Sequence, residues 1–255
     1  MVVLRSNAHS DREIKRGRGS DGMPLLLACA GTWWHIMPMC GRLAVTLPHD
    51  AMAQMFAAQP ANNLPPDVNY NLCPTDQIAV VTGGDARRYM SMRWGFVPHW
   101  YVTENDGPLL INARAETLAE KPAFREACRA RRCLIPVTGW YEWNKDEAGN
   151  RLPWYFWPTD KAPAVLAGIW QTRSDGSNSC ALVTTPANAS LSEVHHRMPV
   201  TLLPDQWALW LGEEGHGAAR LMQPAPDSRF LRHRVRPEVN SNKASGAQLI
   251  LPLEQ

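Results

Sequence analysis

The chain has 255 residues, of which 45% are hydrophobic, and a formal net charge of +2 at pH 7. The length allows one large core or two small ones, and we expect one domain. The charge excludes a strongly basic nucleic-acid binder but leaves a local basic face open, and no apolar run approaches the roughly 18 residues of a membrane span. The six cysteines include no C-x-x-C pair, so the sequence predicts neither a zinc site nor a disulfide scaffold and fits a reducing cytoplasm.

Residues 1–38 differ in composition from the rest of the chain. Residues 12–22 are charged and rich in glycine, and residues 24–30 form a short apolar run. A secretion signal is a poor match, because the apolar run is short and the basic segment before it is long. We expect residues 1–39 to lie outside the fold, either because translation starts at Met37 or Met39 or because a pro-segment is removed. Residues 40–255 then form the domain.

The tetrapeptide Met39-Cys40-Gly41-Arg42 places a cysteine directly after a methionine. If translation starts at Met39 and this methionine is trimmed, Cys40 becomes the N-terminal residue. Its α-amine, with a pKa of about 7.7–8.0, and its thiol, with a pKa of about 8.5, then form a 1,2-aminothiol. Such a group condenses with an aldehyde through its amine to give a Schiff base, and the thiol closes a thiazolidine ring. An internal cysteine cannot react in this way.

From residue 41 onward, short segments with strand or helix patterns follow one another without a βαβ rhythm. Residues 78–82 and 88–92 predict a hairpin around Gly83-Gly84-Asp85, and residues 121–131 predict a helix with Pro122 in its first turn. These elements predict an α+β fold, a single domain with a curved, mostly antiparallel, barrel-like sheet and flanking helices. The other predicted elements are strands at 41–47, 133–137, 140–143, 153–157, 165–170 and 179–184, and helices at 50–58, 206–211 and 217–222.

Aromatic and arginine residues alternate in several places, which is typical of surfaces that bind single-stranded nucleic acid. The segment from Arg93 to Trp100 is one such place in a chain with eleven tryptophans. Asn112 and Arg114 follow the apolar residues 109–111, so we expect both side chains to emerge on one face where a strand ends. Asn112 would serve as an amide donor or acceptor and Arg114 as a phosphate clamp. The alternatives are core tryptophans, a turn asparagine and a surface ion pair.

Two further segments carry candidates for proton transfer. Glu142 lies in Gly139-Trp140-Tyr141-Glu142-Trp143, where burial against tryptophan would raise its pKa toward neutrality; an outward-facing edge-strand glutamate is the alternative. His195-His196-Arg197-Met198-Pro199 contains a natural proton shuttle, and only one of its imidazoles can face a site if the backbone is extended. Zinc binding has little support, because no further ligands have suitable spacing. A set of Cys40, His195 and a carboxylate would instead resemble a cysteine hydrolase.

Taken in this order, the motifs resemble the SOS response-associated peptidase (SRAP) family, which shields abasic sites in single-stranded DNA by covalent attachment. The resemblance covers about residues 40–252, essentially one whole domain. Each motif alone is weak, and the order of all of them makes the resemblance specific. The matching segments are Met39-Cys40-Gly41-Arg42, Tyr70-Asn71-Leu72-Cys73-Pro74, Trp94-Gly95, Ile111-Asn112-Ala113-Arg114-Ala115-Glu116-Thr117, Gly139-Trp140-Tyr141-Glu142-Trp143, Val194-His195-His196-Arg197-Met198-Pro199, Val239-Asn240 and Gly246-Ala247-Gln248-Leu249-Ile250.

The resemblance implies a role for four residues in a covalent reaction. Cys40, as the N-terminal residue, would attack the ring-opened C1′ aldehyde of an abasic deoxyribose with its amine and close the thiazolidine with its sulfur. Asn112 would position the amine or the sugar, Glu142 would shuttle protons, and His195 would act as acid/base toward the sugar hydroxyl. Strand-cleaving lyase activity through the same Schiff base and self-directed peptidase activity are further implications.

The resemblance also implies a DNA-binding surface. It assigns flanking phosphates to Arg42 and Arg114 and the lining of the pocket to Asn71 and Pro74. It implies no metal and no organic cofactor. The expected partner is single-stranded DNA with abasic sites, and we expect a monomer in the cytoplasm, associated with the nucleoid, with no membrane partner. The residues that would pack against exposed bases are Trp94, Trp100 and Trp143.

Two other hypotheses stay open at this point. A thiol peptidase that uses Cys40, His195 and Glu142 would need no free α-amine. A DNA-binding module without chemistry would show salt-dependent binding to intact single strands and no preference for abasic sites. A retained prefix of residues 1–39 would block the covalent reaction and leave only non-covalent binding.

Overall fold

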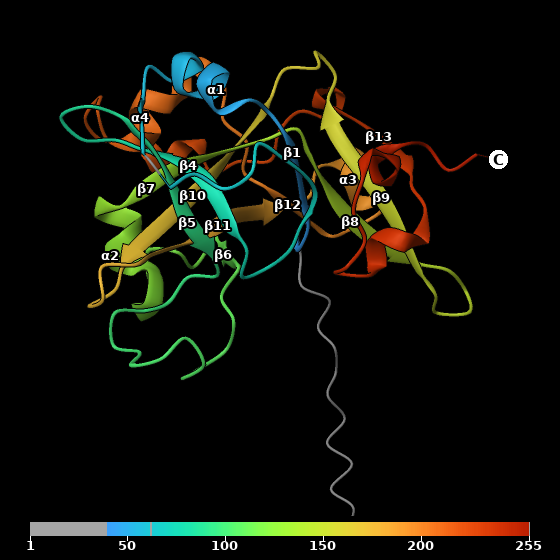
Figure 1. The fold of residues 1–255 in the computed structure, drawn as a ribbon, viewed down its shortest axis with the longest axis horizontal. Helices are drawn as coiled ribbons and strands as arrows, with labels where there is room; N and C mark the ends of the chain where they lie inside the picture. Colours follow the sequence, from blue (N-terminus) through green and yellow to red (C-terminus); the bar gives the residue numbers. More distant parts are fainter. Residues whose placement is uncertain (1–39, 62, 255) are drawn as a thin grey trace, which may run out of the picture. The chain divides into compact units, whose positions relative to one another are not determined.

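The computed structural model describes residues 40–61 and 63–254, and the expectations for residues 1–39 lie outside this range. The described chain is a mixed α+β fold with two sheets, which Figure 1 shows next to each other, and with helices packed against the larger one. The predicted fold class is confirmed. The sheets are mostly antiparallel, as the short strands and the turn residues between them indicate.

Five strands of the larger sheet close into a barrel. Around the ring, β4 (Gln77–Thr82) pairs with β5 (Arg88–Trp94), β5 with β11 (Asn178–Pro186), β11 with β10 (Ala164–Thr172), β10 with β7 (Arg132–Val137), and β7 with β4. The β5–β11 pair is parallel and joins Arg93 to Ser179. Three short strands extend the sheet: β2 (Gln59–Pro60), β6 (Asn112–Arg114) and β12 (Arg197–Pro199).

Alternate residues of the barrel strands belong to two different cores, as the period of two along a strand requires. Val81 and Leu134 pack with residues of α1 (His49–Met55), α2 (Pro122–Ala130) and α4 (Trp207–Leu211), so these helices cover the outer face. The neighbouring residues Val80 and Ile135 belong to the second core. This second core fills the barrel interior and extends to Cys40 at its edge.

The smaller sheet consists of five antiparallel strands in the order β13 (Phe230–Arg234), β9 (Arg151–Pro158), β8 (Gly139–Lys145), β1 (Leu43–Thr46) and β3 (Val68–Leu72). One face, with Leu43 and Trp140, joins the core of the barrel interior. The other face, with Tyr141 and Trp143, packs against Val239 and Leu249 of the short helices η4 (Pro237–Asn240) and η5 (Ala247–Ile250). The remaining helices are α3 (Ala189–Ser192), η1 (Pro204–Gln206), η2 (Ala218–Leu221) and η3 (Asp227–Arg229).

The structure agrees with several predicted elements and revises others. The hairpin of β4 and β5 and the helix α2 with Pro122 at its start are confirmed. The predicted helix at 217–222 is only a 3₁₀ turn. Residues 109–111 do not form a strand that ends at Asn112; instead Asn112 begins β6. The polar strands β3 and β13 have no clear hydrophobic alternation, and for that reason the sequence pattern does not identify them.

Candidate active site

The centre of the candidate site is a hydrogen bond between Cys40 and Glu142. Cys40 lies three residues before β1, and β1 pairs with β8 through Leu43 and Trp140, which brings the middle of β8 beside Cys40. The backbone nitrogen of Cys40 donates to Oε1 of Glu142 at 2.8 Å. Both residues are only 1% exposed. The buried carboxyl group of Glu142 is therefore in direct contact with the backbone nitrogen of Cys40.

Burial sets the protonation of both groups. It raises the pKa of Glu142 well above its ordinary value, and the hydrogen bond from the Cys40 nitrogen opposes this rise only in part. Burial also raises the pKa of the Cys40 thiol, and the nearby Glu142 carboxyl raises it further. The site thus favours a protonated acid and a neutral thiol, and it disfavours a thiolate.

The backbone of Cys40 is strained. Its φ angle is 40°, in the left-handed region that glycine adopts readily and other residues rarely do. Such a conformation costs roughly 1–3 kcal/mol and persists only where surrounding contacts enforce it. The hydrogen bond to Glu142 and the burial of Cys40 in the core are two such contacts.

His195 follows α3 and is held by its own backbone neighbours. Its Nδ1 lies 3.2 Å from the nitrogen and 3.3 Å from the oxygen of Arg197. Burial lowers the pKa of His195, so the neutral imidazole is favoured, whereas His196 is exposed. Among the described residues His195 has no hydrogen bond to Cys40 or Glu142, but its neighbour Val194 packs in the same core as Cys40.

Asn112 is connected to the same region through the barrel. Its neighbour Ile111 packs in the core that contains Cys40, and Leu182 of β11 pairs with Asn112. Alternation along β6 leaves Ala113 fully buried and Arg114 exposed, so Asn112 and Arg114 share a face, as predicted.

A buried arginine ties the segments of Asn112 and His195 together. Arg197, 7% exposed, donates to both carboxylate oxygens of Glu116 at 2.5 and 3.0 Å and to the carbonyl oxygen of Thr184 at 2.7 Å. The hydrogen bond from Arg197 lowers the pKa of Glu116. The sequence contained both partners within its motifs, but their pairing across β11 was not predicted.

The structure revises the predicted roles of Arg42 and Asn71. Arg42 is 6% exposed and donates to the side-chain oxygen of Asn71, to the carbonyl oxygen of Val239 at 2.7 Å and to Oδ1 of Asn242 at 2.8 Å. A guanidinium with these partners is not available to a DNA phosphate. Arg42 and Asn71 instead tie β1 and β3 to the C-terminal segment.

Two of the three predicted base-stacking tryptophans are core residues. Trp94 is 0% exposed and its Nε1 donates to the carbonyl oxygen of Ile111 at 3.1 Å. Trp143 is 4% exposed, donates to Oδ1 of Asn240 at 2.6 Å, and has the guanidinium of Arg151 4.8 Å from its ring centre. Neither ring offers a free face to a base, so the stacking prediction is corrected for both.

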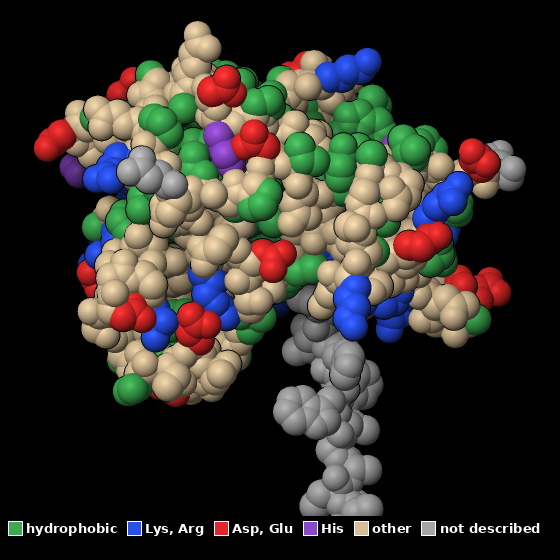
Figure 2. Space-filling view, in the orientation of Figure 1, with side chains coloured by type: hydrophobic (Ala, Val, Ile, Leu, Met, Phe, Trp, Pro, Cys, Tyr) green, Lys and Arg blue, Asp and Glu red, His purple; other side chains and the backbone are tan. Residues whose placement is uncertain are grey.

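The other predicted DNA contacts are accessible. Trp100 is 49% exposed in the loop between β5 and β6, Arg114 is exposed on β6, and Pro74 is partly buried in the turn before β4. Lys and Arg side chains also lie along the lower part of the face in Figure 2, on the barrel side and on the side of β8 and β9. Trp100, Arg114 and Pro74 therefore stay predicted DNA contacts.

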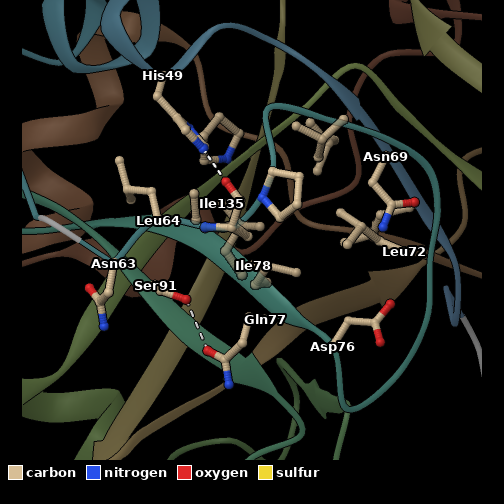
Figure 3. Close-up of a pocket in the computed structure, with 17 residues that line it drawn as sticks. His49, Asn63, Leu64, Asn69, Leu72, Asp76, Gln77, Ile78, Ser91 and Ile135 are labelled. Carbon is tan, nitrogen blue, oxygen red and sulfur yellow. Dashed lines mark hydrogen bonds between the residues drawn. The ribbon is translucent and has the colours of Figure 1, made fainter.

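A cavity of about 430 Å³ lies between the two sheets. Figure 3 shows Leu72, Ile78 and Ile135 lining it, with His49 and Asp76 also at the cavity. None of the predicted catalytic or DNA-binding residues lines it. The described chain also contains no group of three or more His, Cys, Asp or Glu residues arranged to hold a metal ion, and none of its helices has the length and apolarity to span a membrane.

Comparison with known proteins identifies relatives over most of the chain. An abasic site processing protein of Bacillus subtilis, YoaM, is 31% identical over 223 residues, which cover 83% of this chain and 97% of the relative. The abasic site processing protein YedK of Escherichia coli is 29% identical over 84% of this chain and the whole of the relative. The match thus extends over full-length proteins of similar size.

The fold also matches solved structures. A crystal structure of a Bacteroides thetaiotaomicron protein superposes with a TM-score of 0.74 at 24% identity and covers 84% of this chain and 100% of the other. The family model described as SOS response associated peptidase (SRAP) matches residues 39–242, which include Cys40, Glu142 and His195. The chain therefore belongs to the SRAP family.

Proposed function

We propose that this protein processes abasic sites in single-stranded DNA by forming a covalent crosslink through Cys40. The relatives from Bacillus subtilis and Escherichia coli, which match over nearly their whole length, are abasic site processing proteins, and this supports the reaction class. DNA that contains an abasic site is then the partner.

The observation that carries the proposal is the 2.8 Å contact between the Cys40 nitrogen and Glu142. In a chain that begins at Cys40, this nitrogen is the α-amine. A buried acid with a raised pKa at hydrogen-bond distance from the amine is suited to accept and return its protons near neutral pH. If Glu142 acted as a general acid for the thiol alone, it would not need to contact the nitrogen of Cys40.

The overall reaction of the aldehyde with the aminothiol of Cys40 releases one water molecule. The amine of Cys40 adds to the C1′ aldehyde of the ring-opened sugar, and Glu142 is placed to move the protons that turn the hydroxyl into leaving water. The resulting imine carbon then forms a bond to the sulfur, and the thiol proton passes to the nitrogen. Aldehyde and aminothiol give thiazolidine and water, and holding the groups together makes each step effectively unimolecular.

The proposal requires that nothing precedes Cys40 in the reacting protein. We assign residues 1–39 to sequence that is either not translated or removed, and residues 40–255 to the SRAP domain. The strained φ of Cys40 supports removal, because cleavage before Cys40 releases that strain. Glu142 also lies within proton-transfer reach of the nitrogen that such a cleavage would free.

A thiol peptidase is less well supported. Such enzymes use a thiolate next to an imidazolium, which requires a low thiol pKa and a protonated histidine. Here burial raises the pKa of Cys40 and lowers that of His195, so both shifts oppose the ion pair. We therefore assign the peptidase activity in the family's description to cleavage at the protein's own N-terminus.

The test is an intact-mass spectrum of the natural protein, before and after incubation with a single-stranded oligonucleotide that carries one abasic site. We expect a chain that begins at Cys40 and gains the oligonucleotide mass less one water. Cys40→Ala should give no heat-stable adduct. A protein that begins at Cys40 and gains no mass, or a Cys40→Ala variant that still forms the adduct, would contradict the proposal.

A further inference from the structure

Glu142 is the first member of a row of side chains that crosses three strands. In the antiparallel ladders, Glu142 of β8 lies directly opposite Trp154 of β9, and Trp154 lies directly opposite Arg234 of β13. Residues directly opposite each other project from the same face of a sheet. With strands about 4.8 Å apart, the backbone of Arg234 is about 10 Å from that of Glu142. Arg234 therefore lies on the same face of the sheet as Glu142, two strands away from it.

Two arginines pack on Trp154, and they differ in their partners. The guanidinium carbons of Arg232 and Arg234 each lie 5.7 Å from the Trp154 ring centre. Arg232 also donates to the backbone and hydroxyl oxygens of Ser190 and to the carboxylate of Glu193, which anchors α3. Arg234 has no side-chain hydrogen bond and no ion pair within residues 40–61 and 63–254, and its buried Nε has no acceptor. The positive charge of Arg234 thus has no acidic partner among the described residues.

An arginine in this state favours an external anion. Arg234 is partly buried, so it is shielded from bulk water and an unpaired charge there is costly. The guanidinium of Arg234 packs over the Trp154 ring, and its terminal nitrogens have no partner among the described residues, so they are available for bidentate binding. Glu193 is already bound by Arg232, and the raised pKa of Glu142 favours its neutral form. Neither carboxyl group therefore neutralises the charge of Arg234.

We propose that Arg234, supported by Trp154, binds a backbone phosphate of the DNA strand beside the reacting sugar. This inference rests on the proposed function and adds a phosphate contact for it on β13. Phosphates are the anions of a DNA strand, and Arg–phosphate pairs are commonly bidentate. The contact sets the position of the strand relative to Cys40 and takes no part in bond formation.

The test uses the full-length chain and an oligonucleotide with a tetrahydrofuran abasic analogue, which cannot react. Binding is measured by fluorescence anisotropy at several salt concentrations for wild type, Arg234→Gln and Arg234→Lys. The matched control is Arg229→Gln, which removes the same charge from a partly buried arginine that already pairs with Asp160 at 2.6 Å. Thermal unfolding of each variant shows whether the fold is retained.

We expect Arg234→Gln to weaken binding roughly tenfold, the effect of losing one charge-assisted contact, and to reduce the salt slope by about 0.7. Arg234→Lys should recover part of the affinity, and Arg229→Gln should bind like wild type. In a scan that replaces one phosphate at a time by a neutral methylphosphonate, one position should weaken wild type but not Arg234→Gln.

The inference is overturned if folded Arg234→Gln binds like Arg229→Gln, or if every methylphosphonate affects it and wild type equally. Binding of the tetrahydrofuran analogue involves no covalent reaction, so this test of the Arg234 contact is independent of the crosslinking proposal. A wild-type protein that begins at Cys40 and binds the analogue through Arg234, but forms no adduct with a true abasic site, would refute the crosslinking proposal alone.

Discussion

The two faces of β8 have different roles, one in packing and one in the candidate reaction, although their residues alternate along one short motif. Tyr141 and Trp143 pack with the C-terminal segment, and the Trp143 side chain donates to Asn240 there. The Tyr141 hydroxyl donates to the carbonyl oxygen of Tyr70 in β3 at 2.7 Å. Glu142, between them, faces Cys40 and lies opposite Trp154. One face holds the fold together, and the other presents ionisable groups.

The difference shows how a strand supports costly chemistry. A buried carboxyl with a raised pKa destabilises the folded state, and a rigid aromatic face directly behind it supplies compensating packing and hydrogen bonds. Substitutions on the two faces should therefore have separable effects on reaction and stability. The following predictions test that separation.

The largest effect is expected on the reactive face. Glu142→Gln keeps an oxygen that can accept from the Cys40 nitrogen but cannot transfer protons, so crosslinking should slow by about 100-fold or more. Single-turnover adduct formation on a denaturing gel measures this rate. A wild-type rate in a correctly folded variant would assign the proton transfer to another group, with His195 as the next residue to test.

Arg42→Met should act on the structural face. It removes a charged donor from Asn71, Val239 and Asn242, and we expect the free energy of unfolding to fall by at least about 3 kcal/mol. Urea denaturation measures the change. Arg229→Met, which breaks an exposed ion pair, is the control and should cost at most about 1 kcal/mol. Unchanged stability together with weaker DNA binding would restore a phosphate role for Arg42.

Stability should also depend on pH through Glu142. Burial raises the pKa of this carboxyl in the folded state, so folded and unfolded chains are both protonated below the ordinary glutamate pKa. As pH rises from there toward the raised pKa, only the unfolded state ionises and stability is lost. The unfolding free energy of Glu142→Gln relative to wild type should therefore increase from about pH 5 to about pH 8. A constant difference across this range would contradict the raised pKa.

The smallest effect is expected for Trp143→Phe. This change keeps most of the aromatic packing and loses the hydrogen bond to Asn240, so stability should fall by about 1 kcal/mol. The crosslinking rate should stay at the wild-type value, measured in the same single-turnover assay. A large loss of rate would mean that the two faces of β8 are coupled.

Local patterns predicted the parts of the fold that depend on neighbouring residues. The β4–β5 hairpin follows from Gly83-Gly84-Asp85, and the start of α2 follows from Pro122. The aromatic neighbours of Glu142 indicated burial as one of two alternatives, and the structure agrees with burial and with a raised pKa. These signals lie within a few residues of the feature they predict.

Long-range pairing was beyond the sequence patterns. Nothing near Arg42 indicates that its partners lie 197 and 200 residues away, so an arginine in a motif was interpreted as a phosphate contact. The parallel β5–β11 pair that closes the barrel joins distant segments in the same way. Arg234 was missed because β13 is a short polar strand, and its importance depends on its register with Trp154.

The connection from Arg42 to the end of the chain also has a consequence for the time course of synthesis. After Arg42 is translated, 200 further residues are needed to reach Asn242. At about 5–20 residues per second this takes roughly 10–40 s, during which β1 lacks its C-terminal partners. The surroundings of Cys40 are therefore completed late, once the C-terminal segment has been translated and can bind Arg42.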